Sequence, residues 1–245
     1  MIGCDCEVCR SLDYRDKRLR VSVFIEVDSL PAGQAGKNLV IDTGPDFRQQ
    51  MLRERVKNLD AVLLTHSHKD HIAGLDDVRA FNFLQKKGMP IYGTAHTFEQ
   101  IRREYYYAFE GEKYPGIPVL NLHEITGAEF SIDGITITPL PVMHMKMPVL
   151  GFRFGKFSYV TDANRIDEDE KEKIRGSEIF VVNVLRKQSH VSHFSLGEAI
   201  DLVQELNIPT VYFTHISHQL GLHQAIEAEL PARIHLAYDG LILNV

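Results

Sequence analysis

Short apolar runs alternate with helical patterns along most of the chain. The runs are rich in Val, Ile and Phe, and Gly, Pro and Asp interrupt them, which is typical of buried strands. The predicted strands are Val21–Val27, Asn38–Asp42, Ala61–Thr65, Ile135–Leu140, Leu150–Phe154, Phe157–Thr161, Ile179–Val184, Val211–Thr214, Ile234–Ala237 and Leu241–Asn244.

Apolar residues at helical spacing predict helices between these strands. The clearest helix start is Ser195, because Glu198 three residues later completes a capping box. Thr97 is predicted to cap a helix that begins at Phe98. Interleaved strands and helices favour sheets covered by helices over an all-β barrel. The predicted helices are Asp46–Val56, Leu75–Gln85, Phe98–Ala108, Glu168–Ile174 and Leu196–Leu206, with a further short helix that ends before Pro231.

The composition is that of an ordinary globular protein. Hydrophobic residues make up 44% and charged residues 24% of the 245 positions, and without a linker or repeat we expect a single domain over residues 1–245. The formal net charge of −6 argues against nucleic acid as a partner. No apolar run approaches the roughly 20 residues that span a bilayer, and Met1–Arg10 lacks an apolar signal core. We therefore expect a cytoplasmic protein with no membrane partner.

Four potential metal ligands lie within six positions after the apolar run Ala61–Leu64, namely His66, His68, Asp70 and His71. Burying them close together would be costly without a cation, and imidazole with carboxylate suits zinc, manganese or iron. A His-rich surface loop is the alternative, which the compact spacing directly after a strand disfavours.

Further ligand types stand in the same context, just beyond apolar runs. His144, Asp162 and His215 each follow a predicted strand, and a two-metal site needs such additional ligands. Asp42 also ends a strand, before Thr43-Gly44. We interpret Asp42 as the residue that orients a ligand histidine through its other ring nitrogen.

Together these residues resemble the metallo-β-lactamase superfamily. The matching pieces are Asp42-Thr43-Gly44, His66-x-His68-x-Asp70-His71, His144, Asp162 and His215, in that order. The resemblance spans nearly the whole chain and implies an α/β (α+β) fold, the αββα four-layer sandwich of the metallo-β-lactamase type. It also implies two metal ions, one held by His66, His68 and His144, the other by Asp70, His71 and His215, with Asp162 bridging both.

Such a pair of divalent ions, zinc, manganese or iron, has a defined chemistry. Two ions about 4 Å apart lower the pKa of a shared water, so hydroxide is available near neutral pH. The bridging hydroxide would attack an ester, thioester, phosphodiester or amide, and the ions would stabilise the charge on the electrophile's oxygen. The sequence therefore predicts a metal-dependent hydrolase.

The cysteines suggest a separate metal site. Cys4, Cys6 and Cys9 are the only three in the chain, so they cannot form a disulfide framework. Structural zinc sites are closed and four-coordinate, and His218, three residues after His215, is the candidate fourth ligand. Three reduced, unligated thiols are the alternative.

The cysteine cluster and Thr214-His215-x-x-His218-Gln219-Leu220 resemble the PhnP-type cyclic phosphodiesterases. This resemblance implies a structural zinc and action on a cyclic phosphate of a phosphorylated ribose, so a small phosphate ester is the expected substrate. Related chains usually carry an extra strand before the cysteines, whereas this chain begins at Met1-Ile2-Gly3. A truncation and an uncovered sheet edge both account for that difference.

His193 precedes the capped helix, where the resemblance implies an active-site histidine that is not a ligand. We predict His193 and Asp70 as catalytic residues, with His193 protonating the leaving oxygen or binding a phosphate oxygen. A helix-entry histidine without a catalytic role is the alternative. Candidates for substrate binding are Arg186, Lys146 and Arg48. They are weaker candidates, because Lys and Arg side chains are usually solvated surface charges.

These features predict a dinuclear phosphodiesterase for a small cyclic or phosphorylated substrate. A thioester or lactone hydrolase and an RNA-processing nuclease of the same fold are the alternatives. A metal-binding domain without activity is disfavoured, because every ligand position is filled. The resemblance and the Tyr105–Tyr107 run also lead us to expect a homodimer.

Overall fold

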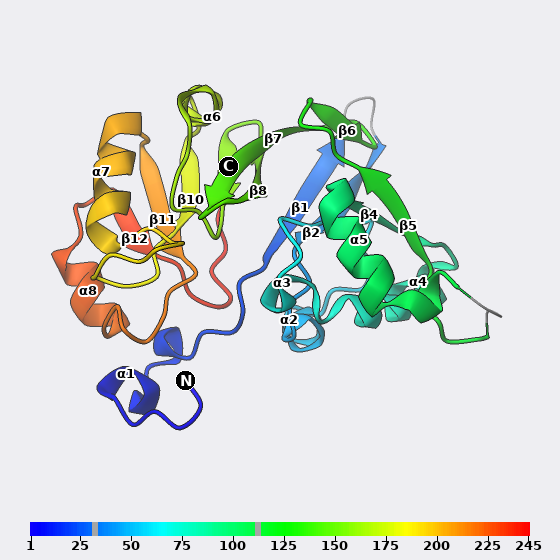
Figure 1. Cartoon of the computed structure of the whole chain (residues 1–245), viewed down its shortest axis with the longest axis horizontal. Coiled ribbons are helices and arrows are strands. Elements are labelled where there is room, and N and C mark those ends of the chain that lie inside the picture. The colour runs from blue at the N-terminus through cyan, green and yellow to red at the C-terminus, as the bar shows by residue number, and fades with distance from the viewer. Residues whose placement is uncertain (31–33, 111–113) are drawn as a thin grey trace. The chain divides into compact units, whose positions relative to one another are not determined.

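The computed structural model describes residues 1–30, 34–110 and 114–245. These residues form two compact units. Unit 1 consists of Met1–Leu19 and Glu129–Val245, and unit 2 consists of Arg20–Ala128. Each unit is built on one β-sheet with helices packed against it (Figure 1). Among the described residues, no helix has the length and apolar character needed to cross a membrane.

The sheet of unit 2 has the strand order β1-β2-β3-β4-β5. β1 and β2 are antiparallel, whereas β2, β3, β4 and β5 are parallel. Residues that follow the parallel strands therefore emerge along one edge of the sheet. The strands are β1 (Val23–Leu30), β2 (Gln34–Ile41), β3 (Ala61–Leu63), β4 (Met89–Gly93) and β5 (Leu120–Glu124).

Helices cover this sheet and share its hydrophobic core. Val62 and Ile91 of the strands belong to the same buried cluster as Phe47, Phe81 and Ile101 of the helices, and burying such side chains stabilises the unit. The helices of unit 2 are α2 (Phe47–Arg53), α3 (Lys69–Ile72), η3 (Leu75–Val78), α4 (Arg79–Gln85), α5 (Ala95–Glu104) and η4 (Tyr106–Ala108).

The sheet of unit 1 has the order β12-β11-β10-β9-β8-β7-β6. β9 to β12 are parallel, and β8 is antiparallel to both β7 and β9. β7 therefore runs in the same direction as β9, β10 and β11, so these strands all end at one edge. The strands are β6 (Phe130–Ile132), β7 (Ile135–His144), β8 (Met147–Phe154), β9 (Phe157–Val160), β10 (Ile179–Asn183), β11 (Thr210–Thr214) and β12 (Ile234–Leu236).

Helix α7 (Leu196–Leu206) packs on the parallel half of the sheet of unit 1. Leu202 and Val203 of that helix are buried in one cluster with Phe180, Val211 and Phe213 of the strands. The predicted capping box at its start is confirmed. The helices of unit 1 are α1 (Glu7–Arg10), η1 (Tyr14–Asp16), α6 (Glu168–Ile174), α7 (Leu196–Leu206) and α8 (His223–Glu229).

Some predicted elements are wrong in detail. The predicted cap Thr97 lies inside α5, and the Thr94 hydroxyl accepts from the Thr97 backbone N–H at 3.2 Å instead. Leu75–Gln85 divides into η3 and α4. Leu241–Asn244 is irregular, because a turn at Gly240 leads out of the sheet and Ile242 is 79% exposed. Strands β4, β5 and β6 were not predicted, because polar residues and Pro90 interrupt their apolar pattern.

Two of the three tyrosines at positions 105–107 form hydrogen bonds within unit 2. The Tyr105 hydroxyl donates to the carbonyl of Ile72 at 2.7 Å, and the Tyr107 hydroxyl donates to Asp76 at 2.6 Å. Burial raises the pKa of Tyr105 to about 12. Tyr106 is exposed, and residues 111–113 lie outside the described residues. The homodimer stays a prediction.

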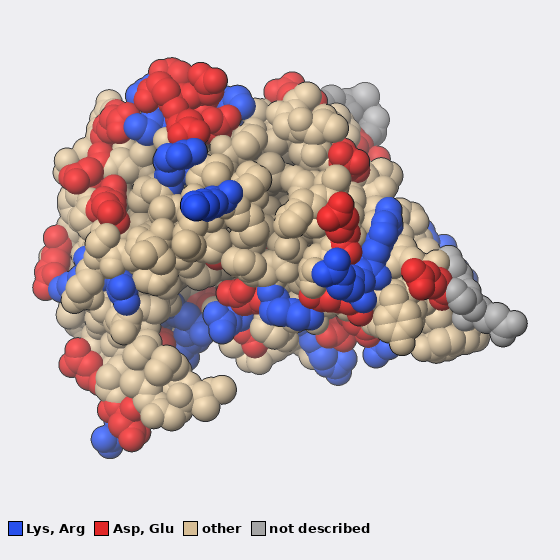
Figure 2. Space-filling view, viewed as in Figure 1, with Lys and Arg blue, Asp and Glu red and all other residues tan. Residues whose placement is uncertain are grey.

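A group of acidic side chains lies on α6. Figure 2 shows acidic side chains gathered over this helix, whose first turn contains Glu168, Asp169 and Glu170. Arg175 binds Glu168 at 2.9 Å, and Lys171 binds Glu205 at 2.7 Å. Carboxylates in the first turn of a helix are favoured by the helix dipole. The acidic residues of α6 are therefore explained by the stability of the helix.

Candidate metal centre

Asp42 is the buried centre of a polar cluster in unit 2. It follows β2 directly, its exposed fraction is 0%, and its φ of 64° lies in the left-handed region, which non-glycine residues keep only where the surroundings enforce it. Its Oδ1 accepts from the backbone N–H of Thr65 at 2.8 Å. Its Oδ2 accepts from the Thr65 hydroxyl at 2.8 Å and lies 2.7 Å from Nδ1 of His71.

These contacts determine which nitrogen of two histidines carries hydrogen. Because a carboxylate accepts, Nδ1–H of His71 donates to Asp42. The single hydrogen of the Thr65 hydroxyl also goes to Asp42, so its oxygen accepts from Nδ1–H of His66 at 2.9 Å. In both neutral rings the lone pair then lies on Nε2, which is the tautomer that binds a metal through Nε2.

The four predicted ligands of the histidine motif lie close together in unit 2. The His66 ring centroid is 4.6 Å from that of His68 and 4.2 Å from that of His71. Asp70 Oδ2 lies 3.8 Å from Nε2 of His71. β3 ends at Leu63, before the first of these residues. The loop that leads into α3 therefore brings the side chains together, and the alternation of side chains along a strand plays no part.

Two glycines allow the backbone of this cluster to pack closely. A Cβ on Gly44 would lie 2.3 Å from the carbonyl oxygen of Asp70, and a Cβ on Gly74 would lie 2.2 Å from that of Gly44. Thr43 N–H donates to His71 O at 2.8 Å, and Gly74 N–H donates to Thr43 O at 2.8 Å. The Asp42-Thr43-Gly44 turn thus holds the histidine motif against the end of β2.

Asp162 is the buried centre of a second cluster, in unit 1. It follows β9, is 2% exposed and has a φ of 54°. Its Oδ1 accepts from the Thr161 hydroxyl at 2.7 Å and lies 3.1 Å from Nε2 of His215. Its Oδ2 lies 3.3 Å from Nε2 of His193. Asn183 forms two hydrogen bonds with the backbone of Ala163 and so supports the turn that carries Asp162.

Three of the histidines of unit 1, His144, His193 and His215, lie at the same edge of its sheet. His144 ends β7, and its Nδ1–H donates to the carbonyl of Ser192 at 2.8 Å, which leaves the lone pair on Nε2. His215 follows β11 with a φ of 54°. The His193 ring lies 4.7 Å from His144 and 4.9 Å from His215 between centroids. One ligand atom each from Asp162, His193 and His215 lies within 4.8 Å of the others.

The predicted substrate-binding cations lie in different surroundings. Arg186 donates to the carbonyls of Gln188 at 3.3 Å and Ser189 at 2.9 Å and to Gln219 at 3.2 Å. It therefore shapes the loop that carries His193. Lys146 and Arg48 are exposed. Sequence reasoning missed Thr65, Asn183 and Ser192; only Thr65, directly after a strand, carried a signal.

The three cysteines and His218 meet in unit 1. Each offers one ligand atom, and these atoms lie within 4.8 Å of one another. Nδ1 of His218 is 3.5 Å from Sγ of Cys4 and 3.4 Å from Sγ of Cys6. A tetrahedral zinc with ordinary bond lengths has sulfur–nitrogen edges of about 3.5 Å, so the donor set fits this ion.

Electrostatics of the cysteine cluster agree with cation binding. The hydrogen bond with His218 lowers the pKa of the Cys6 thiol to about 6, so this group favours the thiolate that metals require. The segment is anchored nearby, since Asp16 accepts from the backbone N–H of His223 at 2.8 Å and the Tyr14 ring packs edge-on against Tyr238 at 5.8 Å.

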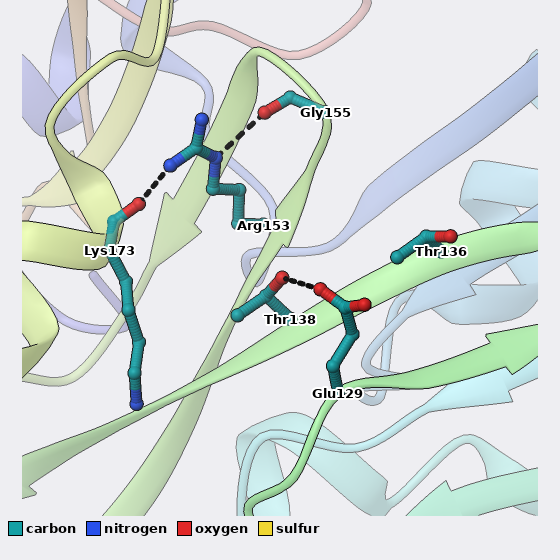
Figure 3. A pocket seen from close by; sticks show the side chains of 6 residues that line it. All are labelled: Glu129, Thr136, Thr138, Arg153, Gly155 and Lys173. Atoms are coloured by element: carbon teal, nitrogen blue, oxygen red, sulfur yellow. Dashed lines mark hydrogen bonds between the residues drawn. The ribbon is translucent and has the colours of Figure 1, made fainter.

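A hollow of about 410 Å³ on β7 and β8 contains none of these residues. Figure 3 shows its lining, in which Arg153 donates to the carbonyls of Gly155 and Lys173 and Thr138 donates to Glu129. Thr136 lies eight residues before His144 on β7, roughly 26 Å at the rise of a strand. The hollow is therefore separate from the histidines of unit 1.

Comparison with known proteins gives the family. Residues 37–216 match the family model described as "Beta-lactamase superfamily domain". The solved structure described as "a New Diphosphatase from the PhnP Family" superposes with a TM-score of 0.90 at 37% identity. The match covers 100% of this chain and 91% of that one. The predicted metallo-β-lactamase fold class and the resemblance to the PhnP type are confirmed.

Two curated relatives have other names. An octanoyltransferase of Porphyromonas gingivalis is 39% identical over 98% of this chain, which spans only 48% of that protein's length. A ribonuclease Z of Mycobacterium marinum is 29% identical over 83% of this chain and 87% of its own. With the family model and the PhnP structure in agreement, the chain belongs to the beta-lactamase superfamily and has the metallo-β-lactamase fold of the PhnP type.

Proposed function

We propose that this chain hydrolyses a phosphodiester or diphosphate bond of a small phosphorylated molecule with two divalent metal ions. The observation that supports this most is the hydrogen bonding of Asp42, which gives His66 and His71 the Nε2 lone pair that a metal ion takes. The diphosphatase relative, at 37% identity over the whole chain, supports a phosphorylated substrate.

The resemblance to the superfamily supplies the proposed ligand sets. One ion would be held by His66, His68 and His144. The other would be held by Asp70, His71 and His215, and Asp162 would be a ligand of both. When bound, two such ions supply hydroxide near neutral pH and stabilise charge on the phosphoryl oxygens. The donor set of imidazoles and carboxylates suits zinc, manganese or iron.

The protein's own groups do the remaining work. Asp42, Thr65 and the Ser192 carbonyl orient the ligand rings through their Nδ1 atoms. His193 is the proposed general acid, because its Nδ1 contacts the Ser192 hydroxyl at 2.9 Å and its Nε2 faces Asp162. A proton from His193 would go to the leaving oxygen of the substrate.

Removing a proposed ligand should stop hydrolysis without unfolding the chain. We expect His68→Ala and Asp162→Ala to lower kcat on bis(p-nitrophenyl) phosphate by about 100-fold or more, measured after reconstitution with zinc or manganese. His96→Ala, at an exposed position of α5, is the control. Full activity in both ligand variants would contradict the two-metal proposal.

Asp42 should control metal affinity while touching no metal. Asp42→Asn keeps the shape of the side chain but weakens the acceptor that orients His66 and His71, so we expect metal to bind about 10- to 100-fold more weakly. Competition with a chelator measures this, with Asp201→Asn on the exposed face of α7 as the control. Unchanged affinity would show that the rings do not depend on Asp42.

His193→Ala separates proton transfer from metal binding. If His193 is the general acid, kcat falls by about 100- to 10,000-fold while the metal content equals that of the wild type. Loss of a metal equivalent would instead assign His193 as a ligand, which its distance to Asp162 also permits. Unchanged turnover would remove it from the mechanism.

We propose a structural zinc at Cys4, Cys6, Cys9 and His218. Cys6→Ser should remove one zinc equivalent, measured by elemental analysis, and lower Tm by about 10 °C, since a loss of a few kcal/mol has that effect in a chain of this size. Asp5→Ala, exposed between two of the cysteines, is the control. A wild-type zinc content in Cys6→Ser would argue for unligated thiols.

Acyl-bond hydrolysis is the second candidate function. The octanoyltransferase relative supports it, because octanoyl transfer is acyl chemistry and the same ligands activate water for either bond. Ribonuclease Z relatives support a nuclease more weakly, at 29% identity or below across most of the chain. A panel of cyclic phosphates, diphosphates, octanoyl thioesters and short RNA, assayed with each metal, separates these functions.

A further inference from the structure

Arg20 is the cation placed beside the histidine cluster of unit 2. Its Nη1 donates to Asp70 Oδ2 at 3.4 Å, and Asp70 in turn lies 3.8 Å from His71. Its side chain is 59% exposed. An exposed Arg–Asp pair contributes little to stability, so the fold does not depend on this contact.

The backbone of Arg20 is nevertheless held on both sides. Its N–H donates to Asp46 Oδ2 at 2.8 Å, and its carbonyl accepts from the buried Gln50 side chain at 2.8 Å. A Cβ on Gly44 would lie 3.3 Å from the Arg20 Cβ, so the turn after β2 leaves room for this residue. Arg20 is thus a positioned side chain whose guanidinium faces solvent next to the proposed ligands.

The neighbouring cation is arranged differently. Lys69, the residue before Asp70, forms an ion pair with Glu104 of α5, which directs its charge to that helix. A guanidinium has five N–H donors and suits the geometry of phosphate oxygens, whereas only one donor of Arg20 is directed at Asp70.

We propose that Arg20 binds a phosphate group of the substrate beside Asp70 and so selects anionic substrates. This rests on the proposed phosphorylated substrate. A metal ion bound to Asp70 would neutralise much of the carboxylate's charge. The remaining N–H donors of Arg20 would then donate to a phosphate oxygen. Arg20 is in this sense a specificity-determining residue, distinct from Arg186, whose guanidinium is directed at loop carbonyls.

The test measures phosphate binding by metal-loaded protein, with inorganic phosphate as the probe in isothermal titration calorimetry. We expect Arg20→Gln to weaken phosphate binding by about 10- to 100-fold, the effect of one charge-assisted contact, and Arg20→Lys to weaken it less. Metal content should equal that of the wild type, and KM for bis(p-nitrophenyl) phosphate should rise. Arg79→Gln, which breaks a comparable exposed pair with Asp76 at 3.2 Å, is the matched control.

Unchanged phosphate affinity in Arg20→Gln would overturn the proposal. A loss of affinity together with a loss of metal would also overturn it, because Arg20 would then act through Asp70. Failure of the proposed function would give a different result, because the wild type would then cleave no phosphate ester or diphosphate with any metal. The titration would still show whether phosphate binds through Arg20.

Discussion

The buried carboxylate of Asp42 is the interaction on which the unit 2 cluster depends. One oxygen orders the backbone at Thr65, and the other collects hydrogens from Thr65 and His71. A buried carboxylate is costly unless it is fully hydrogen-bonded, and here the bonds that stabilise it also align two imidazoles. The same hydrogen bonds therefore stabilise the buried carboxylate and orient the two histidine rings.

Strand direction does the equivalent work in unit 1. Because the chain reverses direction both before and after β8, β7 and the parallel strands β9 to β11 end at one edge. His144, Asp162 and His215 emerge there. Asp162 and His215 both have positive φ, so the chain leaves each strand by a sharp turn. His218, three residues after His215, joins the cysteine cluster, and one short segment thereby serves both proposed metal sites.

Much of this arrangement was readable in the pattern of residues. Apolar runs ending in His or Asp predicted β2, β3, β7, β9 and β11 and the ligand types beyond them, because strand ends and ligand chemistry are local properties. The family resemblance supplied the grouping of the ligands. Strands β4 to β6 were missed because polar residues and Pro90 interrupt their apolar pattern, and pairing with neighbouring strands, which the local pattern does not contain, places them in the sheets.

By itself the sequence determined the strands that lead to the candidate site, the residues proposed as ligands and the superfamily, since these depend on local pattern and motif order. Only the tertiary structure decided that one carboxylate orients both His66 and His71, that the Ser192 carbonyl orients His144, and that Arg186 serves a loop while Arg20 lies beside Asp70. Such roles depend on hydrogen-bond distances between residues far apart in the chain, and a linear pattern carries no information about those distances.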